Sequence, residues 1–152
     1  MKIEEWKSFL EQAILVKLAN IDSNRPLKLL DVGVFPWHAS IELSAFYVGD
    51  RSEDDLASWP SYNFSHQEEG QWPEVESLCE VMNTEYIAGK MAAARVAATY
   101  FHATADVMKR SAIAAALKAK WLDDDFQIMV LDPDDPETDY MQGGDTRTGD
   151  VS

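Results

Sequence analysis

Two strands joined by a short bend are the feature of this sequence that most constrains its fold. Residues 28–48 alternate large aliphatic side chains with small or polar ones, a period of two that is typical of half-buried strands. A four-residue bend at 36–39 brings the aliphatic side chains of both strands onto one face. The predicted cross-strand pairs are Val34 with Ile41, Val32 with Leu43, and Leu30 with Ala45. The sequence therefore predicts an antiparallel hairpin with one apolar and one polar face.

The polar face of this hairpin carries the best candidates for catalysis. Asp31 and Glu42 are diagonal neighbours, Gly33 lies opposite Glu42, and His38 lies in the bend. Two carboxyl groups can act as acid and base where their surroundings separate their pKa values. Polar residues on the solvent face of a sheet are also the ordinary case, so a small hydrolase-type enzyme using Asp31, Glu42 and His38 is the alternative function.

Helices are predicted before and after the hairpin. Residues 3–20 place an apolar residue at every third or fourth position, and Pro73 is well suited to open a helix over 73–88. The alanine-rich residues 91–120 form one helix of about 45 Å if unbroken. Because that is long for a chain of this size, we expect a break near the sequence HATAD, with Thr104 as a cap for the second half.

The remaining segments complete the predicted architecture. The run FQIMVL at 126–131 is nearly continuous in apolar residues, which predicts a central strand. Residues 132–152 are acidic and contain proline and glycine, which predicts a flexible tail. We therefore expect a single α+β domain over residues 1–131, in which an antiparallel β-sheet packs against several α-helices.

Several kinds of chemistry lack their sequence signature. The histidines show no metal-ligand spacing, and neither a phosphate-binding loop nor a dinucleotide motif is present. Cys79 lies on the apolar stripe of its helix, which predicts a buried thiol. A single cysteine and the lack of any run of about 20 apolar residues favour a cytoplasmic protein that does not enter membranes. We expect no metal, no cofactor and no enzymatic activity.

Net charge is the strongest global signal. The chain of 152 residues has a formal charge of −14 at neutral pH. Residues 1–85 contribute −10, residues 86–120 contribute +5, and residues 121–152 contribute −9. A field of this sign repels nucleic acids and anionic membranes and attracts basic surfaces.

Acids and aromatic rings gather in the long connection over residues 49–73. Long connections in compact domains are often functional, and buried aromatics anchor interfaces whose charges steer the partner. The candidate partner-binding residues are Asp50, Glu53, Asp54, Asp55, Trp59, Tyr62, Glu68, Glu69 and Trp72. A second interpretation is equally open, in which the tryptophans complete the core and the acids keep the surface soluble.

The stretch DRSEDDLASWPSYNF, the net charge, the single-domain length and the lack of a catalytic motif give the chain a general likeness to one class of proteins. It resembles the immunity proteins of bacterial polymorphic-toxin and contact-dependent inhibition systems. That resemblance implies a small acidic α+β domain that masks a toxin by stoichiometric binding. The predicted function is therefore to bind a basic partner protein, and a nucleic-acid mimic is a further alternative.

Overall fold

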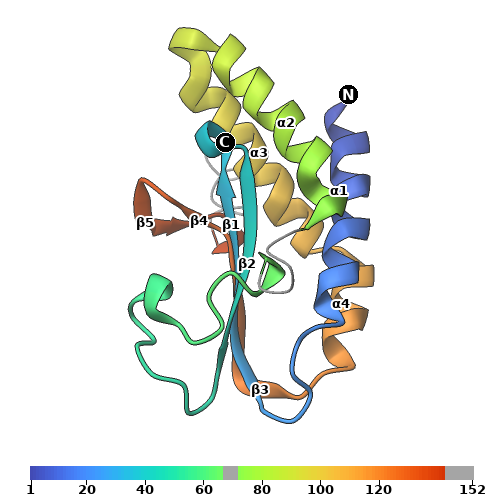
Figure 1. Cartoon of the computed structure of the whole chain (residues 1–152), viewed down its shortest axis with the longest axis vertical. Coiled ribbons are helices and arrows are strands. Elements are labelled where there is room, and N and C mark those ends of the chain that lie inside the picture. The colour runs from blue at the N-terminus through green and yellow to red at the C-terminus, as the bar shows by residue number, and fades with distance from the viewer. Residues whose placement is uncertain (67–71, 143–152) are drawn as a thin grey trace, which may run out of the picture.

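The computed structural model describes residues 1–66 and 72–142, and shows a sheet with four α-helices on one side (Figure 1). This arrangement confirms the predicted α+β class. The helices are α1 (Ile3–Leu18), α2 (Pro73–Ala88), α3 (Ala93–Met108) and α4 (Ser111–Lys118). The strands are β1 (Leu27–Phe35), β2 (Ser40–Tyr47), β3 (Leu122–Met129), β4 (Leu131–Asp132) and β5 (Asp135–Asp139).

The hairpin has the predicted register. Strands β1 and β2 are antiparallel, and all three predicted aliphatic pairs are present. Gly33 lies opposite Glu42, as the same register requires. A short 3-10 turn at Pro36–His38 forms the bend, and Ala39 closes it in the left-handed conformation with a φ of 50°.

The third strand differs from the prediction. The order of the main sheet is β2-β1-β3, and β3 runs parallel to β1, so the sheet is mixed and β3 lies at its edge. The prediction of a wholly antiparallel sheet with 126–131 at its centre is therefore wrong. The chain reaches β3 from the end of α4, at the end of the sheet where β1 also begins, and such crossovers join parallel strands.

The apolar face of the hairpin and the helices enclose one core. Trp6 of α1 is fully buried, and its indole nitrogen donates a hydrogen bond to the Leu78 carbonyl at 3.0 Å. Cys79 is buried, as predicted. Among the helices of the described residues, none is long and apolar enough to cross a bilayer.

The alanine-rich segment breaks later than predicted. α3 ends at Met108, and Arg110 adopts an extended conformation before α4 begins. Thr104 lies inside α3 and donates its hydroxyl hydrogen bond back to the Tyr100 carbonyl at 2.8 Å. Because this bond satisfies the hydroxyl within the helix, Thr104 does not cap a new helix, and that prediction is wrong.

Residues 132–142 also differ from the predicted tail. Strands β4 and β5 form a small antiparallel hairpin, and the Tyr140 nitrogen bonds to the Val130 carbonyl at 2.8 Å. The Tyr140 ring packs against Phe101 and His102 of α3, with centroid distances of 5.2 and 4.7 Å. An aromatic anchor therefore fixes this segment to the domain. Residues 143–152 of the predicted tail lie outside the described residues.

Candidate functional site

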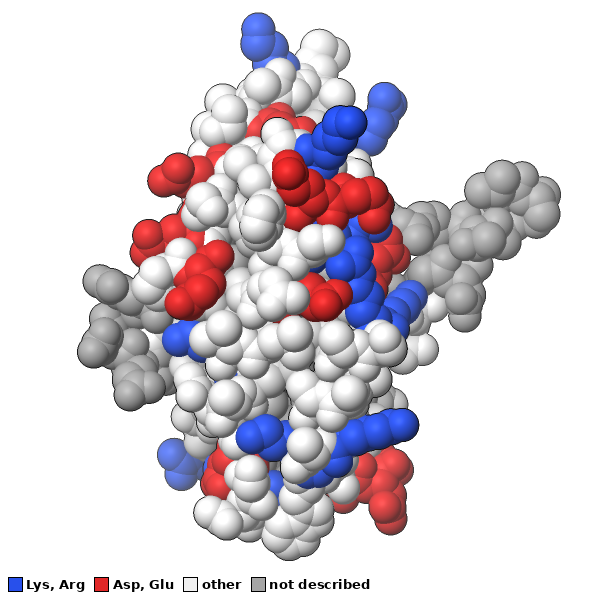
Figure 2. Space-filling view, turned by 90° about the vertical axis from the view of Figure 1, so that its right-hand side faces the viewer, with Lys and Arg blue, Asp and Glu red and all other residues white. Residues whose placement is uncertain are grey.

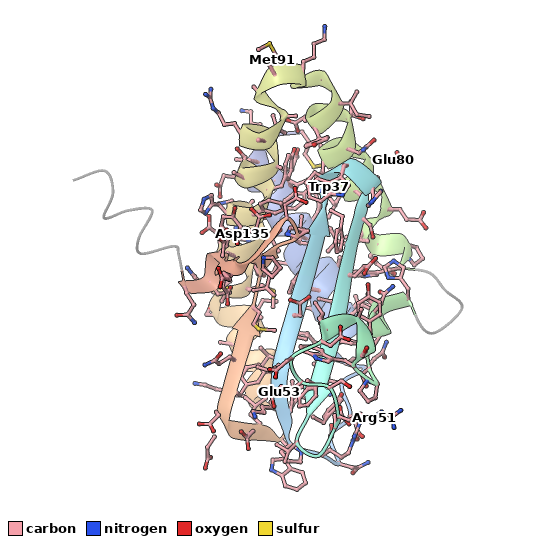
Figure 3. The ribbon with its side chains drawn as sticks, turned by 90° about the vertical axis from the view of Figure 1, so that its left-hand side faces the viewer. Trp37, Arg51, Glu53, Glu80, Met91 and Asp135 are labelled. Carbon is pink, nitrogen blue, oxygen red and sulfur yellow. The ribbon has the colours of Figure 1, made fainter. Side chains whose placement is uncertain are left out.

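The face of the sheet opposite the helices, here called the pocket face, is covered from two sides. The connection after β2 lies over one end of it and the β4–β5 hairpin over the other, as the positions of Glu53 and Asp135 show in Figure 3. The connection is held down by Trp59, which is buried against Phe46 at a centroid distance of 5.4 Å. The Asn63 amide also donates to the Ser44 hydroxyl at 2.8 Å. Hydrogen bonds to β2 and packing of aromatic rings thus hold residues 48–66 of this connection against the sheet as a fixed wall.

Between these two covers lies a hollow of about 380 Å³, here called the acidic pocket. Its volume is within the range of small ligand sites. Apolar groups from Phe35, Leu56, Leu131 and two prolines form part of its wall. Its acidic residues come from three separate parts of the chain and are Asp31, Glu42, Asp54, Asp55 and Asp132.

Asp31 is the most deeply placed of these acids. The residue is 3% exposed, and within residues 1–66 and 72–142 its carboxyl group receives no hydrogen bond. Burial, and after it the negative charges of Asp139 and Glu42, raise the pKa of Asp31 to about 7. A buried carboxyl group in this setting is costly to ionise unless a positive partner joins it.

Glu42 lies beside Asp31 on the neighbouring strand and is held in place by two hydroxyl groups. The Tyr62 hydroxyl donates to one of its oxygens at 3.1 Å and the Ser40 hydroxyl to the other at 3.2 Å. Burial and the nearby Glu42 charge raise the pKa of Tyr62, so the phenol stays a donor at neutral pH. A carboxylate can accept about four hydrogen bonds, so Glu42 keeps acceptor capacity toward the pocket.

Gly33 lies between the two carboxyl groups and leaves room for the edge of the Phe35 ring. A Cβ atom at this position would lie 2.9 Å from Cε2 of the Phe35 ring and 3.7 Å from Oδ2 of Asp31. Any larger residue would therefore push the ring aside and reduce the pocket. The absence of a side chain here leaves Asp31 and Glu42 facing a shared hollow.

The positive charges of the described residues lie away from the acidic pocket. No lysine, arginine or histidine lines the acidic pocket, and its five acids form no ion pair within the described ranges. Figure 2 shows the helix side, where basic and acidic side chains are interspersed. There Arg110 pairs with Glu11 at 3.0 Å, and Lys7 pairs with Asp106 at 3.2 Å. Within the part of the chain that the structure describes, many acids on the helix side are therefore paired with a base, whereas those of the pocket have no cation.

The predicted catalytic trio is only partly assembled. Asp31 and Glu42 lie together as predicted, but His38 is exposed in the bend, touches the Trp37 ring, and does not line the pocket. The interpretation of His38 as a partner of the two carboxyl groups is therefore wrong. The 3-10 turn carries the histidine past the end of the sheet.

The predicted docking loop divides into two parts. Trp59 and Trp72 are buried, with exposures of 4% and 1%, which supports the interpretation that these rings complete the core. Asp50 pairs with Arg25 at 3.0 Å and Glu53 pairs with Lys28 at 2.9 Å, so the chain's own bases partly neutralise them.

Three other residues of that loop lie at the acidic pocket. Asp54 and Asp55 are exposed and line the mouth of the acidic pocket, and Tyr62 forms part of its wall. Glu68 and Glu69 lie outside the described residues. Partner binding by this loop stays a prediction.

The sequence interpretation assigned Asp132 to a flexible tail, whereas the structure places it in the lining of the acidic pocket. This residue follows Leu131, and its carboxylate accepts hydrogen bonds from the Asp134 amide at 2.9 Å and the Tyr140 hydroxyl at 3.2 Å. A tyrosine within an otherwise polar segment was the available signal that the segment packs on the domain.

Comparisons with known proteins do not extend this description. No protein-family model matches the chain, and no significant match was found among curated proteins or solved structures. Among residues 1–66 and 72–142, no group of three or more histidine, cysteine or acidic side chains is arranged to hold a metal ion. Function is therefore inferred from the acidic pocket itself.

Proposed function

We propose that this protein binds a basic partner protein, and that the acidic pocket receives a positively charged group of that partner. One observation carries the proposal: five acids surround a hollow that no lysine, arginine or histidine of residues 1–66 and 72–142 lines. One of those acids, Asp31, is buried without a hydrogen bond from the described residues.

The energetics of the pocket favour a cationic ligand. An ionised carboxyl group removed from water needs a charge partner or several hydrogen bonds. A cation placed between Asp31 and Glu42 would provide both and would relieve the repulsion between them. The apolar part of the wall would contact the hydrocarbon stem that carries such a group in a lysine or arginine side chain.

The charge of the whole chain supports the same choice of partner. A net charge of −14 raises the encounter rate with a basic protein, and the exposed Asp54 and Asp55 extend that field at the mouth of the pocket. Stoichiometric masking of a toxin, which the resemblance to immunity proteins implies, is one form of this function. The fixed walls favour it further, because a preformed site loses little entropy on binding.

A second candidate function is acid–base catalysis by Asp31 and Glu42. The observation that favours it is the pKa of Asp31, raised to about 7 beside a second carboxyl group. A group with such a pKa can hold and release a proton near neutral pH. Turnover of small glycoside or ester substrates that is lost in both Asp31→Asn and Glu42→Gln would support catalysis over binding.

Cross-linking in cells followed by mass spectrometry tests the proposed function. The captured partner should be basic, and the recombinant partner should bind with a Kd that rises with salt. Glu42→Gln/Asp55→Asn should weaken that binding by about tenfold or more, which corresponds to about 1.4 kcal/mol. The matched control is Glu5→Gln/Glu80→Gln, which removes two exposed acids from α1 and α2. Equal binding by the wild type and the pocket variant would overturn the proposal.

A further inference from the structure

We propose that the positively charged group received by the acidic pocket is the guanidinium of an arginine side chain, held between the carboxyl groups of Asp31 and Glu42. This inference rests on the proposed function and names the chemistry that the site selects. Lysine is the competing side chain.

The placement of the two carboxyl groups favours a forked donor. Asp31 lies on β1 and Glu42 on β2, and Gly33, which has no side chain and is covered by the edge of the Phe35 ring, lies between them. A guanidinium carries five N–H donors in one plane and can bond to two carboxyl groups at once, whereas an ammonium is a compact point charge. Hydrogen bonds of this charged, two-pronged kind are the strongest that side chains form.

The composition of the wall favours arginine in a second way. The Phe35 ring covers Gly33 of β1, and the ring of Tyr62, from the loop after β2, lies beside Glu42 of β2. Aromatic rings therefore line the pocket next to both strands. A guanidinium is less strongly hydrated than an ammonium and stacks on aromatic rings. Moving it into a partly apolar pocket therefore costs less free energy of desolvation than moving a lysine ammonium.

Binding of a guanidinium should also release a proton. Burial raises the pKa of Asp31 to about 7, so its carboxyl group is partly protonated at neutral pH, and a nearby cation lowers that pKa. The groups that face Asp31 are Glu42 of β2, Asp139 of β5, Asp132 of β4, Tyr62, and the loop acids Asp54 and Asp55. No basic residue of the described ranges is among them, so the incoming cation supplies the positive charge.

Titration with short peptides tests this choice. The probes are acetylated, amidated Gly-Arg-Gly, its lysine and citrulline counterparts, and free L-arginine, each followed by NMR chemical shifts of the wild-type protein. We expect the arginine peptide to bind at least about fivefold more tightly than the lysine peptide. The citrulline peptide keeps the shape of arginine without its charge and should show no saturable shifts.

Two variants and a buffer comparison localise the effect. Asp31→Asn and Glu42→Gln should each abolish the preference for arginine, and Glu5→Gln/Glu80→Gln should retain it. Calorimetry at pH 7 in buffers of different ionisation enthalpy should detect proton release for the wild type and none for Asp31→Asn.

The possible outcomes separate this inference from the proposed function. Equal affinity for the arginine and lysine peptides, or tighter binding of free L-arginine than of the peptide, would overturn the inference. Partner binding that still depends on Glu42 and Asp55 would then leave the proposed function standing. Selective arginine binding combined with partner binding that ignores these residues would instead reject the proposed function.

Discussion

The two faces of the β1–β2 hairpin are formed by alternate residues of the same two strands, yet they lie in opposite physical environments. Toward the helices, Leu30, Val32, Ile41 and Leu43 are fully buried in one apolar core. Toward the pocket, the intervening positions include Asp31, Gly33, Glu42 and Ser44, which line the hollow. Burial is therefore similar for Leu30 and Asp31, although one is apolar and the other is a carboxyl group.

This difference shows how stability and function are divided within one pair of strands. Burial of the aliphatic side chains stabilises the fold by about 1.5–3 kcal/mol for each large side chain. Burial of Asp31 acts in the opposite direction whenever its carboxyl group is ionised. A chain that retains such a group in a preformed pocket is stabilised further when a cation binds.

Shortening a core side chain on the helix face should give the largest effect on stability. Leu43→Ala removes a fully buried side chain opposite Val32, and we expect it to lower the free energy of unfolding by about 3–5 kcal/mol. Urea denaturation measures this change. Glu42→Gln, one position away on the pocket face, is the control and should change stability by less than about 1 kcal/mol. Similar losses from both variants would contradict the division of the two faces.

Replacing the buried carboxyl group of Asp31 should give a gain in stability that depends on pH. The pKa of Asp31 is about 7 in the folded protein and 3.8 as its ordinary value. The folded state therefore holds the proton more tightly, and unfolding releases it between these two values. Stability then falls as pH rises from about 4 to 7, by on the order of 4 kcal/mol at most. We expect Asp31→Asn to be more stable than the wild type at pH 8, by about 2–3 kcal/mol. This gain is smaller than the maximum because the pocket is open to water, which partly solvates the ionised carboxyl group.

The measurement is a series of urea denaturation curves for both proteins between pH 4.5 and 8.5. Titrating groups that do not face Asp31 act on both proteins alike, so the difference between the two free energies reports Asp31 together with Glu42 and Asp139, to which its charge is coupled. That difference should grow in favour of Asp31→Asn up to about pH 7 and then level off. A difference that stays constant over this range would show that burial does not raise the pKa of the Asp31 carboxyl group.

The sequence predicts the hairpin well because the information that sets it is local. A period of two decides which side chains share a face, and Pro36 fixes the bend, so the register and the meeting of Asp31 with Glu42 both follow. The bounds of α2 are also local, because Pro73 suits the first turn and Gly89 lies at the end. Each of these features depends on residues within a few positions of one another.

The parts that could not be predicted depend on contacts between distant segments. An apolar run such as 126–131 has the same pattern in a parallel or an antiparallel pairing, so its place beside β1 is decided by the path of the chain after α4. The burial of Asp31 depends on covers formed by the loop after β2 and by the β4–β5 hairpin. The second cover is fixed by Tyr140 against Phe101, a contact that the composition of residues 132–152 does not reveal.

The smallest expected effect concerns the bond that fastens one cover to the pocket. The Tyr62 hydroxyl donates to Glu42 at 3.1 Å, and both residues are partly buried. A double-mutant cycle with Tyr62→Phe, Glu42→Met and the double variant removes the donor, the acceptor or both, and isolates this pair from the other contacts of each residue. We expect a coupling free energy of about 1 kcal/mol in urea denaturation, since hydrogen bonds to charged groups contribute at least this much when water is partly excluded. The pair Tyr62→Phe and Asp54→Asn, for which no direct bond is present between the two residues, should show a coupling close to zero. If both cycles give the same value, the bond between Tyr62 and Glu42 does not help to hold the loop, and Glu42 is free to serve only the ligand.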